Sequence, residues 1–265
     1  MSLPLVSIIL STYNGSQYIS ESISSVLTQS YSNFEFIIIN DCSTDNVEQI
    51  ILNFQKKDKR IIYIKNKENI KLTRSLNKWL EISKWKYIAR IDDDDIWMKH
   101  KLEKQVKFME ENNDYWLCWT STIIINSEWN EIQRINMRKN NDEIKNNILK
   151  SNQFTHSSIV IRKKILNSIW WYYYNKWNWA EDYELWLRIW KISKLHNLSE
   201  YLVKYRWLNT SISRKKWLKQ EIMAFKIMIK NKNYYPNFLG SLFLRIITMI
   251  IPQKVKKKII SFIKK

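Results

Sequence analysis

Residues 87–97 read YIARIDDDDIW, an apolar run that ends in four consecutive carboxylates. Like charges this close repel one another, so a strand that ends in them needs a compensating group. A divalent cation is the simplest such group, because Mg²⁺ and Mn²⁺ prefer oxygen ligands and Mg²⁺ usually binds through carboxylates plus substrate phosphates. A solvated acidic turn is the alternative interpretation, since Asp is a common turn residue.

Strands and helices alternate on both sides of this stretch. Continuous apolar runs predict strands at residues 5–10, 34–40, 61–64 and 87–91. Helical spacing of apolar residues predicts helices within residues 18–27, 47–54, 72–82 and 101–111. The alternation predicts an α/β fold with a mostly parallel sheet flanked by helices.

Polar clusters follow three of the predicted strands, at residues 12–14, 41–45 and 92–95. In parallel sheets of this kind, ligands bind beyond the carboxyl ends of the strands. Solvation alone does not explain why three strands end alike, so we expect one ligand site to which all three clusters contribute.

The chain beyond Leu117 gives weaker signals. Residues 117–126 and 154–161 have strand character, and residues 136–152 predict a connection with a short helix. A helix opens at residue 180, so Glu181 and Asp182 lie at its N-terminal end, where the helix dipole favours negative charge. One of these carboxylates could also act as a general base. Residues 205–214 predict a polar loop, in which Arg206 is either a phosphate ligand or a surface arginine.

Composition limits the classes of protein that fit. The chain has 265 residues and is 45% hydrophobic, which suits a sizeable core and excludes global disorder. Its two cysteines make no disulfide scaffold, and no run of 18 apolar residues predicts a spanning helix. The net charge is +19, and residues 218–265 carry +10 of it, from 11 Lys and Arg against one Glu.

This charge distribution predicts two parts, an α/β domain at residues 1–217 and a basic helical tail at residues 218–265. Within the tail, residues 254–265 alternate basic and apolar groups at helical spacing. That pattern favours an amphipathic anchor on an anionic membrane surface. The alternative is a helix that packs on the domain with a solvated basic face.

Four motifs of this chain, taken together and in this order, resemble those of family 2 glycosyltransferases, over about residues 4–213. They are Ser7–Asn14, Ile39–Asp45, Ala89–Asp95 and Glu181–Trp186. The resemblance implies a Rossmann-like GT-A fold and a transfer reaction with inversion. The expected donor is a nucleotide-sugar, usually a UDP-sugar, and the expected acceptor is a hydroxyl of a glycan or lipid-linked glycan, in cell-surface polysaccharide synthesis. The expected location is cytoplasmic, peripheral on the inner face of the cell membrane.

The resemblance also implies roles for individual residues. Asp94 would hold Mg²⁺ or Mn²⁺ with Asp92, and Asp182 would be the catalytic base with Glu181 beside it. His156 and Trp186 would lie on the acceptor side. The nucleotide-sugar would be bound by Thr12, Tyr13, Asn14, Asp41, Arg90, Asp92, Asp93, Asp95 and Arg206.

Glycine and tryptophan usage departs from the family pattern. Only two glycines occur, against 14 tryptophans, and both Cys42 and Lys71 stand where relatives often have glycine. Relatives also commonly have glycine at six positions where this chain has tryptophan, namely Trp79, Trp85, Trp116, Trp119, Trp170 and Trp171. Our hypothesis is that the source genome reads UGA as glycine, so that these residues are glycine in the native protein. An aromatic-rich core or a carbohydrate-stacking surface is the alternative.

Three other functions fit parts of the sequence. Net charge and aromatic content suggest a nucleic-acid binder, but the charge is concentrated in one tail and the acidic cluster would repel phosphate, so no nucleic acid is expected. A non-catalytic binder of glycans or nucleotide-sugars is disfavoured by intact Asp94 and Asp182. A nucleotidyltransferase usually has a glycine-rich phosphate loop, which the chain as written does not have.

Overall fold

The computed structural model describes residues 4–83, 86–137, 140–150, 152, 154–169, 180–208 and 216–250. Its strands are β1 (Val6–Thr12), β2 (Phe34–Asn40), β3 (Ile61–Lys65), β4 (Tyr87–Arg90), β5 (Ile96–Trp97), β6 (Tyr115–Ile125), β7 (Glu131–Ile135), β8 (Val160–Arg162) and β9 (Lys194–Arg206). Its helices are α1 (Ile19–Leu27), α2 (Val47–Gln55), α3 (Leu72–Ile82), α4 (Lys101–Glu111), α5 (Asn141–Asn147), η1 (His156–Ser158), α6 (Lys163–Ser168), α7 (Glu181–Trp190), α9 (Trp217–Lys230) and α10 (Phe238–Ile250).

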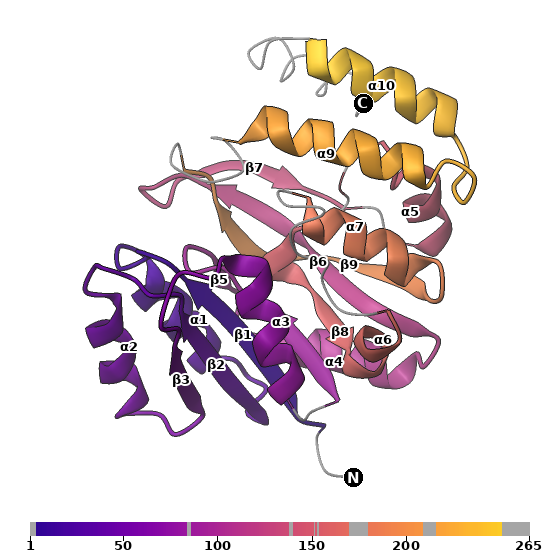
Figure 1. Cartoon of the computed structure of the whole chain (residues 1–265). Coiled ribbons are helices and arrows are strands. Elements are labelled where there is room, and N and C mark those ends of the chain that lie inside the picture. Colours follow the sequence, from indigo (N-terminus) through magenta and orange to yellow (C-terminus); the bar gives the residue numbers. More distant parts are fainter. Residues whose placement is uncertain are drawn as a thin grey trace.

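The first half of the sheet is parallel. Its strands follow the order β3-β2-β1-β4, and β1 pairs with β2 on one side and β4 on the other, Ile8 lying opposite both Phe36 and Ala89 (Figure 1). The chain starts in the middle of this sheet and builds strands outward on both sides. The strand order therefore reverses between β1 and β4. In sheets of this kind, ligands bind at such a point, in a crevice beyond the carboxyl ends of the strands.

The second half of the sheet is mixed. Strand β8 runs antiparallel to both β4 and β6, while β9 runs parallel to β6 and antiparallel to β5. A hairpin adds β7 to β6. The predicted α/β class is confirmed, but the sheet as a whole is mixed instead of mostly parallel.

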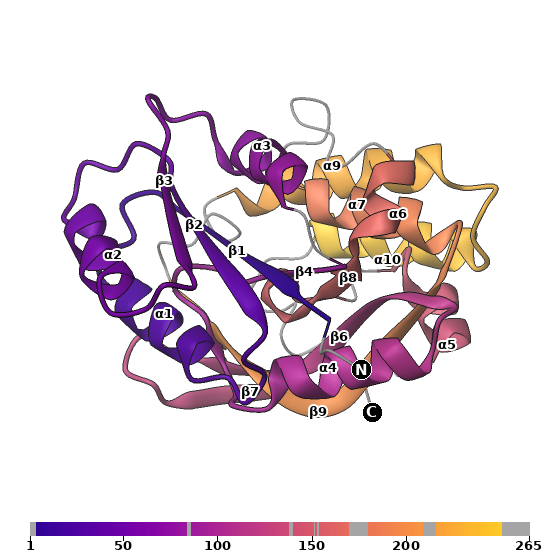
Figure 2. The ribbon, with the colours of Figure 1, turned by 90° about the horizontal axis from the view of Figure 1, so that it is seen from below.

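Two hydrophobic cores cover the two faces of the sheet. In β2, the buried side chains alternate between them, because successive residues of a strand point to opposite faces. Ile38 packs with helices α1, α2 and α4, whereas Ile37 and Ile39 pack with α3 and the later helices. Figure 2 shows α1 and α2 on one side of the sheet and α3, α6 and α7 on the other. Burial on both faces explains the continuous apolar runs of the strands.

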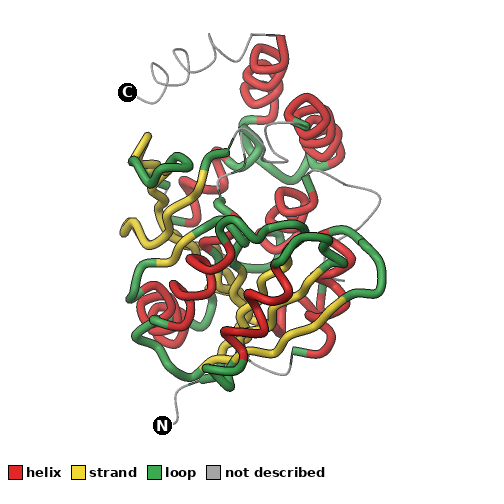
Figure 3. The backbone as a smooth tube through the Cα atoms, turned by 90° about the vertical axis from the view of Figure 1, so that its left-hand side faces the viewer, coloured by secondary structure: helices red, strands yellow, loops and turns green. Residues whose placement is uncertain are grey.

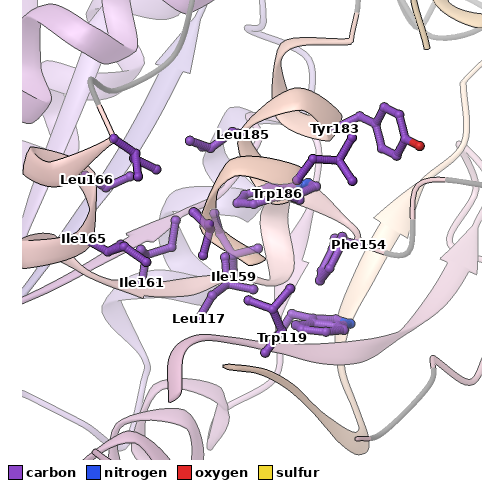
Figure 4. Packing of buried hydrophobic residues seen from close by; sticks show 14 of the residues in the cluster. Leu117, Trp119, Phe154, Ile159, Ile161, Ile165, Leu166, Tyr183, Leu185 and Trp186 are labelled. Carbon is purple, nitrogen blue, oxygen red and sulfur yellow. The ribbon is translucent and has the colours of Figure 1, made fainter. Parts of the chain in front are cut away.

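The later helices enclose the larger core. Trp119 of β6, Phe154 and Trp186 of α7 meet in its centre, with ring centroids 4.1 Å apart for the first pair and 5.5 Å for the second (Figure 4). Ile227 and Met228 of α9 are fully buried in the same core. Residues 217–230 therefore share a core with the domain, while the boundary predicted at residue 217 stays a prediction.

The last two helices lie side by side at the end of the molecule opposite the N-terminus (Figures 1 and 3). In the described part of the chain, no helix combines the length and the apolar character needed to cross a membrane. The tail beyond residue 250, including the predicted anchor at residues 254–265, lies outside the described residues.

The element predictions hold best before residue 112, where every predicted strand and helix is present. Two later predictions are wrong in part. Only residues 160–162 of the strand predicted at 154–161 are β-strand, because His156 lies in the 3₁₀ turn η1. Arg206 ends the 13-residue strand β9 instead of lying in a polar loop.

Five described non-glycine residues have a left-handed backbone, and three of them bear on the glycine hypothesis. Cys42 and Lys71, where relatives often have glycine, have φ of 62° and 71°. Trp129, in the turn between β6 and β7, also has φ of 71°. A tryptophan in this region is strained, because its Cβ approaches the backbone. The conformation at Trp129 therefore supports the glycine hypothesis at a position that the sequence comparison had not selected.

The structure bears on only two of the six tryptophans named in that hypothesis. Trp119 is fully buried and packs on Phe154, which favours an aromatic core there, although its Nε1 has no hydrogen-bond partner in the described structure. Trp116 is partly buried against the same core. The side chain of Trp79 and residues 85, 170 and 171 lie outside the described residues.

Candidate active site

The carboxyl ends of β1 and β4 are joined by a side-chain contact. Thr12, the last residue of β1, donates its Oγ1 hydrogen to Oδ2 of Asp93. Gly15 packs directly against this pair, since a Cβ there would lie 2.0 Å from Asp93 Oδ2 and 2.4 Å from Thr12 Oγ1. Only glycine fits this close approach. Thr12, Gly15 and Asp93 thus lie in close contact beyond the carboxyl ends of β1 and β4.

The loops after β1 and β2 hold each other in place. Asn14, with φ of 58°, accepts a hydrogen bond from the backbone N–H of Thr44 at 2.8 Å and donates its own N–H to Ser43 Oγ at 3.0 Å. Tyr13 between these contacts is 51% exposed. The predicted nucleotide residues Thr12, Tyr13 and Asn14 therefore form one rigid loop, in which Tyr13 offers an open aromatic ring.

Asp41 anchors the loop that follows β3. Its carboxylate is buried and accepts hydrogen bonds from Asn66 Nδ2 at 2.8 Å, the N–H of Ile70 at 3.0 Å, the N–H of Lys71 at 2.9 Å and Ser75 Oγ at 3.1 Å. These bonds explain how Lys71 is held at positive φ. Direct contact of Asp41 with a nucleotide stays a prediction.

Arg90 and Asp92 form a buried ion pair at the end of β4. Two guanidinium nitrogens of Arg90 bind the two Asp92 oxygens, one of them at 2.9 Å, and Arg90 itself is buried. Ser157 of η1 donates its hydroxyl to Asp92 Oδ2 at 3.0 Å and accepts the N–H of the same residue. Asp92 is therefore balanced by a cation and tied to the second half of the chain.

The other three carboxylates of the run carry raised pKa values. Burial, reduced in effect by the Thr12 hydrogen bond, raises the pKa of Asp93 to about 6. Burial and the three neighbouring carboxylates raise the pKa of Asp94 to about 9. Burial and next the Asp92 charge raise the pKa of Asp95 to about 7. All three shifts mean that this site disfavours bare negative charge, and that a bound cation would be stabilised there.

The donor set fits a hard divalent cation in part. Asp95 is fully buried, and its Oδ2 has no hydrogen-bond partner among the described residues. Within the same residues, no group of three or more His, Cys, Asp or Glu side chains is placed to hold a metal. Mg²⁺ typically takes only one or two protein carboxylates and completes its shell with phosphate oxygens and water. The site therefore suits a metal that arrives with a diphosphate.

Arg206 closes the far side of the acidic loop. Its guanidinium is fully buried, pairs with Glu21 of α1 and donates from Nε to the Asp94 carbonyl at 3.0 Å. It lies between the rings of Tyr18 at 4.3 Å and Trp129 at 4.7 Å. Its backbone N–H donates to Asp95 Oδ1 at 2.9 Å. The structure thus corrects the expectation of a surface arginine, because Arg206 is buried and fixes the loop that carries Asp94, whereas contact with a phosphate stays a prediction.

The predicted base lies at the start of α7. Asp182 accepts hydrogen bonds from Asn152 Nδ2 at 2.8 Å and from the N–H of Tyr183 at 2.7 Å. Burial raises its pKa, and the nearby Arg90 charge opposes that rise. A carboxylate with a raised pKa is better matched to proton abstraction near neutral pH than an ordinary aspartate. Glu181 precedes it in the same first turn and is partly buried.

His156 and Trp186, the two residues predicted for the acceptor side, lie in contact with each other. Their rings meet edge to face with centroids 5.5 Å apart. Burial and next the Arg90 charge hold the pKa of His156 well below its usual range, so the imidazole is neutral. Trp186 is fully buried and supports His156 from the core. The structure therefore corrects the expectation that Trp186 itself faces the acceptor.

The structure brings most of the predicted residues to one place. Arg90 links them, because its charge acts on Asp92, His156 and Asp182. Four contributors were missed, namely Gly15, Glu21, Asn152 and Ser157. Gly15 could have been found, since it is one of only two glycines. The others act through contacts distant in sequence and give no local signal.

Comparison with known proteins shows the family of this chain. The sequence model of the family described as Glycosyl transferase family 2 matches residues 7–170. A protein of Methanocaldococcus jannaschii, described as an uncharacterized glycosyltransferase, is 36% identical over 244 residues, which are 89% of this chain and 83% of that protein. Escherichia coli WfgD, named as a UDP-Glc:alpha-D-GlcNAc-diphosphoundecaprenol beta-1,3-glucosyltransferase, is 33% identical over 219 residues, 80% of this chain and 81% of WfgD.

Among solved structures, S. aureus TarS 1–349 in complex with UDP-GlcNAc matches with a TM-score of 0.70. The match covers 89% of this chain and 69% of that one at 18% identity. Such a likeness shows the fold alone, and it confirms the GT-A fold that the motifs had implied.

Proposed function

Since this chain belongs to glycosyltransferase family 2, we propose that it moves a sugar from a UDP-sugar to a hydroxyl of a glycan or lipid-linked glycan, with inversion at the anomeric carbon. The chain is thus a glycosyltransferase that uses a nucleotide-sugar. The choice of uridine, the acceptor and the role in cell-surface polysaccharide synthesis are parts of the proposal.

The observation that carries the proposal is the meeting of two carboxylate sets around Arg90. The acidic run follows β4, where Asp92 pairs with Arg90, and the charge of the same arginine opposes the rise in the pKa of Asp182 at the start of α7. One set suits the donor diphosphate with its cation, and the other suits an acceptor hydroxyl. A two-substrate displacement needs both, one on each side of the reacting carbon.

On the donor side, we propose that Asp94 holds Mg²⁺ or Mn²⁺, with Asp92 as its neighbour and Asp95 in support. When bound, such a cation neutralises the negative charge that develops on the departing diphosphate. The raised pKa values and the unpartnered Asp95 oxygen support this assignment. Asp92 already pairs with Arg90, so Asp94 is the more available ligand.

On the acceptor side, Asp182 takes the proton of the acceptor hydroxyl. The acceptor oxygen then forms a bond to the anomeric carbon while the bond from that carbon to the diphosphate oxygen breaks, and UDP leaves. Asn152 and the Tyr183 N–H hold the Asp182 carboxylate in one orientation. Neutral His156 can accept a hydrogen bond from the incoming sugar or donate one to it.

The nucleotide would lie on the loops that follow β1 and β2. Exposed Tyr13 offers a ring for the base, and Thr12 and Asn14 hold that loop in shape. The E. coli relative WfgD is named for UDP-Glc, and the TarS structure contains UDP-GlcNAc. These names support a uridine donor and leave the sugar itself to experiment.

A lipid-linked acceptor would place the protein at the inner face of the cell membrane. WfgD is named for a diphosphoundecaprenol acceptor, and residues 254–265 of this chain alternate lysine with apolar residues. Each basic residue near an anionic surface contributes about 1 kcal/mol of binding. Replacing Lys256, Lys257 and Lys258 with Glu should release the protein from anionic vesicles; unchanged sedimentation with them would remove the anchor from the proposal.

The first experiment is calorimetric titration of UDP into the full chain with and without Mn²⁺. We expect binding that depends on the metal, and Asp94→Ala should weaken it at least about tenfold, since it removes the ligand between cation and protein. Asp114→Ala is the matched control, because this exposed carboxylate pairs with Lys194 far from the acidic run. If the folded chain bound no nucleoside diphosphate in the presence of metal, the proposal would fail.

Turnover separates an enzyme from a non-catalytic binder. Release of UDP from a UDP-sugar panel in the presence of lipid-linked acceptor should require Asp182, whereas UDP binding should not. Binding without turnover for any donor and acceptor tried would favour the non-catalytic alternative.

A further inference from the structure

Helix α10 buries its one charged side chain and exposes several of its apolar side chains. Arg245 is the only charged residue between Phe238 and Ile250, and it points into the protein. Its Nε donates to the carbonyl of Leu149 at 3.0 Å, and its Nη1 lies 3.4 Å from Glu221 of α9. The guanidinium also sits 5.0 Å from the centre of the Tyr183 ring. These contacts fix the rotation of α10 about its own axis.

The outward face of α10 is apolar as a result. Leu239 is 76% exposed and Phe243 is 66% exposed, and Ile246 is also exposed. The spacing of 239, 243 and 246 places all three on one side of the helix. A helix on the surface of a soluble domain normally shows the opposite arrangement, with charges outside and apolar groups inside.

Helix α9, which packs against α10, also exposes apolar residues. Leu218, Ile222 and Ile229 are exposed at spacings that again share one helix face. The two helices pack against each other and lie at the end of the molecule opposite the N-terminus (Figures 1 and 3). Single exposed apolar residues are common, whereas six on two adjoining helices mark an interaction surface.

We propose that the exposed apolar face of α9 and α10 inserts into the interfacial region of an anionic lipid bilayer. Charge complementarity selects this occupant, because lysines at 219, 226, 230 and 232 flank the face and four more follow α10 at 254, 256, 257 and 258. An apolar face bordered by lysines is the pattern of interfacial helices. A second protein copy would bring the same positive charge and be repelled.

The position of the face also suits a lipid-linked acceptor. Helix α7, which carries the proposed base Asp182 in its first turn, packs against the segment after α9, where Tyr235 Oη donates to the Leu187 carbonyl at 2.6 Å. The membrane contact would thus be rigidly connected to the acceptor side. This inference deepens the proposed function, but lipid binding itself requires no turnover and is measured separately.

The test is flotation of the full chain with phosphatidylcholine vesicles, with and without phosphatidylglycerol. The double variant Leu239→Ser/Phe243→Ser should bind anionic vesicles at least about tenfold more weakly, since it removes the largest apolar groups from the lipid. The loss should persist in high salt, which screens the lysines but not apolar contacts. Ile62→Ser on β3 is the matched control, because it changes an exposed apolar side chain of the other half.

Two results would overturn the inference. One is unchanged vesicle binding by the double variant. The other is a concentration-dependent dimer of the parent chain that the double variant abolishes, because the face would then belong to a second copy. Calorimetric titration of UDP with Mn²⁺ into both variants shows that the donor site is intact, so a failure of the membrane contact is distinguishable from a failure of the proposed function.

Discussion

The region before residue 112 and the region after it are built by different rules. In the first, strands β1 to β4 are continuous apolar runs that pair in parallel with one another, and helices α1, α2 and α4 pack on one face of them. In the second, β8 has three residues and β9 has 13, and β9 returns to pair with strands that lie up to about a hundred residues earlier. The structure of the first region can largely be predicted from local sequence patterns. The structure of the second depends on pairing between segments that are far apart in the chain.

The two regions also divide the proposed chemistry. The donor residues follow β1, β2 and β4, whereas His156 and Asp182 come from η1 and α7. If this division is real, changes in one region should alter binding of the donor, and changes in the other should alter turnover alone. Substitutions can therefore test it directly.

Asp182→Asn should have the largest effect. It removes the proposed base while keeping the side-chain volume, so turnover should fall by about 10²–10⁴-fold. The affinity for UDP with Mn²⁺ should stay unchanged, because the donor loops are untouched. Steady-state rates and calorimetry on the same preparation measure both quantities.

Glu181→Gln is the paired control for that change, since it makes the same substitution of charge one residue earlier. A smaller loss of turnover is expected there. If the two variants exchanged their effects, Glu181 would be the base; if Asp182→Asn weakened UDP binding as much as turnover, the division between the regions would collapse.

Trp119→Gly should be the most destabilising core change in the second region. The indole is fully buried against Phe154, so its removal leaves a cavity, and the free energy of unfolding should fall by about 3–5 kcal/mol or more. Urea denaturation followed by circular dichroism measures this. Trp129→Gly should act in the opposite direction, raising stability by up to about 1 kcal/mol, because it relieves the positive φ at a small loss of packing on Arg206.

These two changes also test the glycine hypothesis site by site. A stabilising Trp119→Gly would show that glycine suits β6 and would extend the hypothesis into the core. Mass spectrometry of peptides from native material gives the direct answer, and an intact tryptophan at 129 would end the hypothesis there.

Gly15→Ala should damage the first region. The added methyl would meet Asp93 and Thr12 at less than van der Waals distance, so we expect a loss of about 1–3 kcal/mol in stability together with weaker UDP binding. Thermal denaturation and calorimetry measure the two effects. Unchanged UDP affinity would mean that the contact between β1 and β4 does not shape the donor site.

Gly240→Ala should give the smallest effect and the opposite sign. No heavy atom lies within 4 Å of the added methyl in α10, and alanine lowers the entropy of the unfolded chain. Stability should rise by about 0.4–1 kcal/mol in the same denaturation experiment. A destabilised Gly240→Ala would show that α10 is packed more closely than its exposed face implies.

The sequence sufficed for much of the fold, while the location of the site stays a prediction. Apolar runs and helical spacing correctly predict β1 to β4 and α1 to α4, because each is stabilised by a buried face that the pattern reveals. The spacing of apolar residues does not predict β9. Its 13 residues mix exposed and buried positions, because the strand pairs with β6 along most of its length and with β5 near its end.

The contacts of individual side chains are likewise only partly predictable from the sequence. The role of Asp94 follows from its own motif, but that of Arg206 does not, because Glu21, Tyr18 and the Asp94 carbonyl reach it from far away in the chain. A charged residue near a predicted loop looks exposed until its partners are known. Burial of a paired arginine is a tertiary property that one-dimensional pattern cannot contain.

The acidic loop is fixed by contacts from two distant parts of the chain. Strand β4 pairs with β1 at one end of the loop, and β5 and Arg206 fix the other end through β9. Residue 206 lies more than a hundred residues after the aspartates that it secures. A nascent chain that had emerged from the ribosome only as far as β8 would therefore lack the contacts that hold this loop in shape.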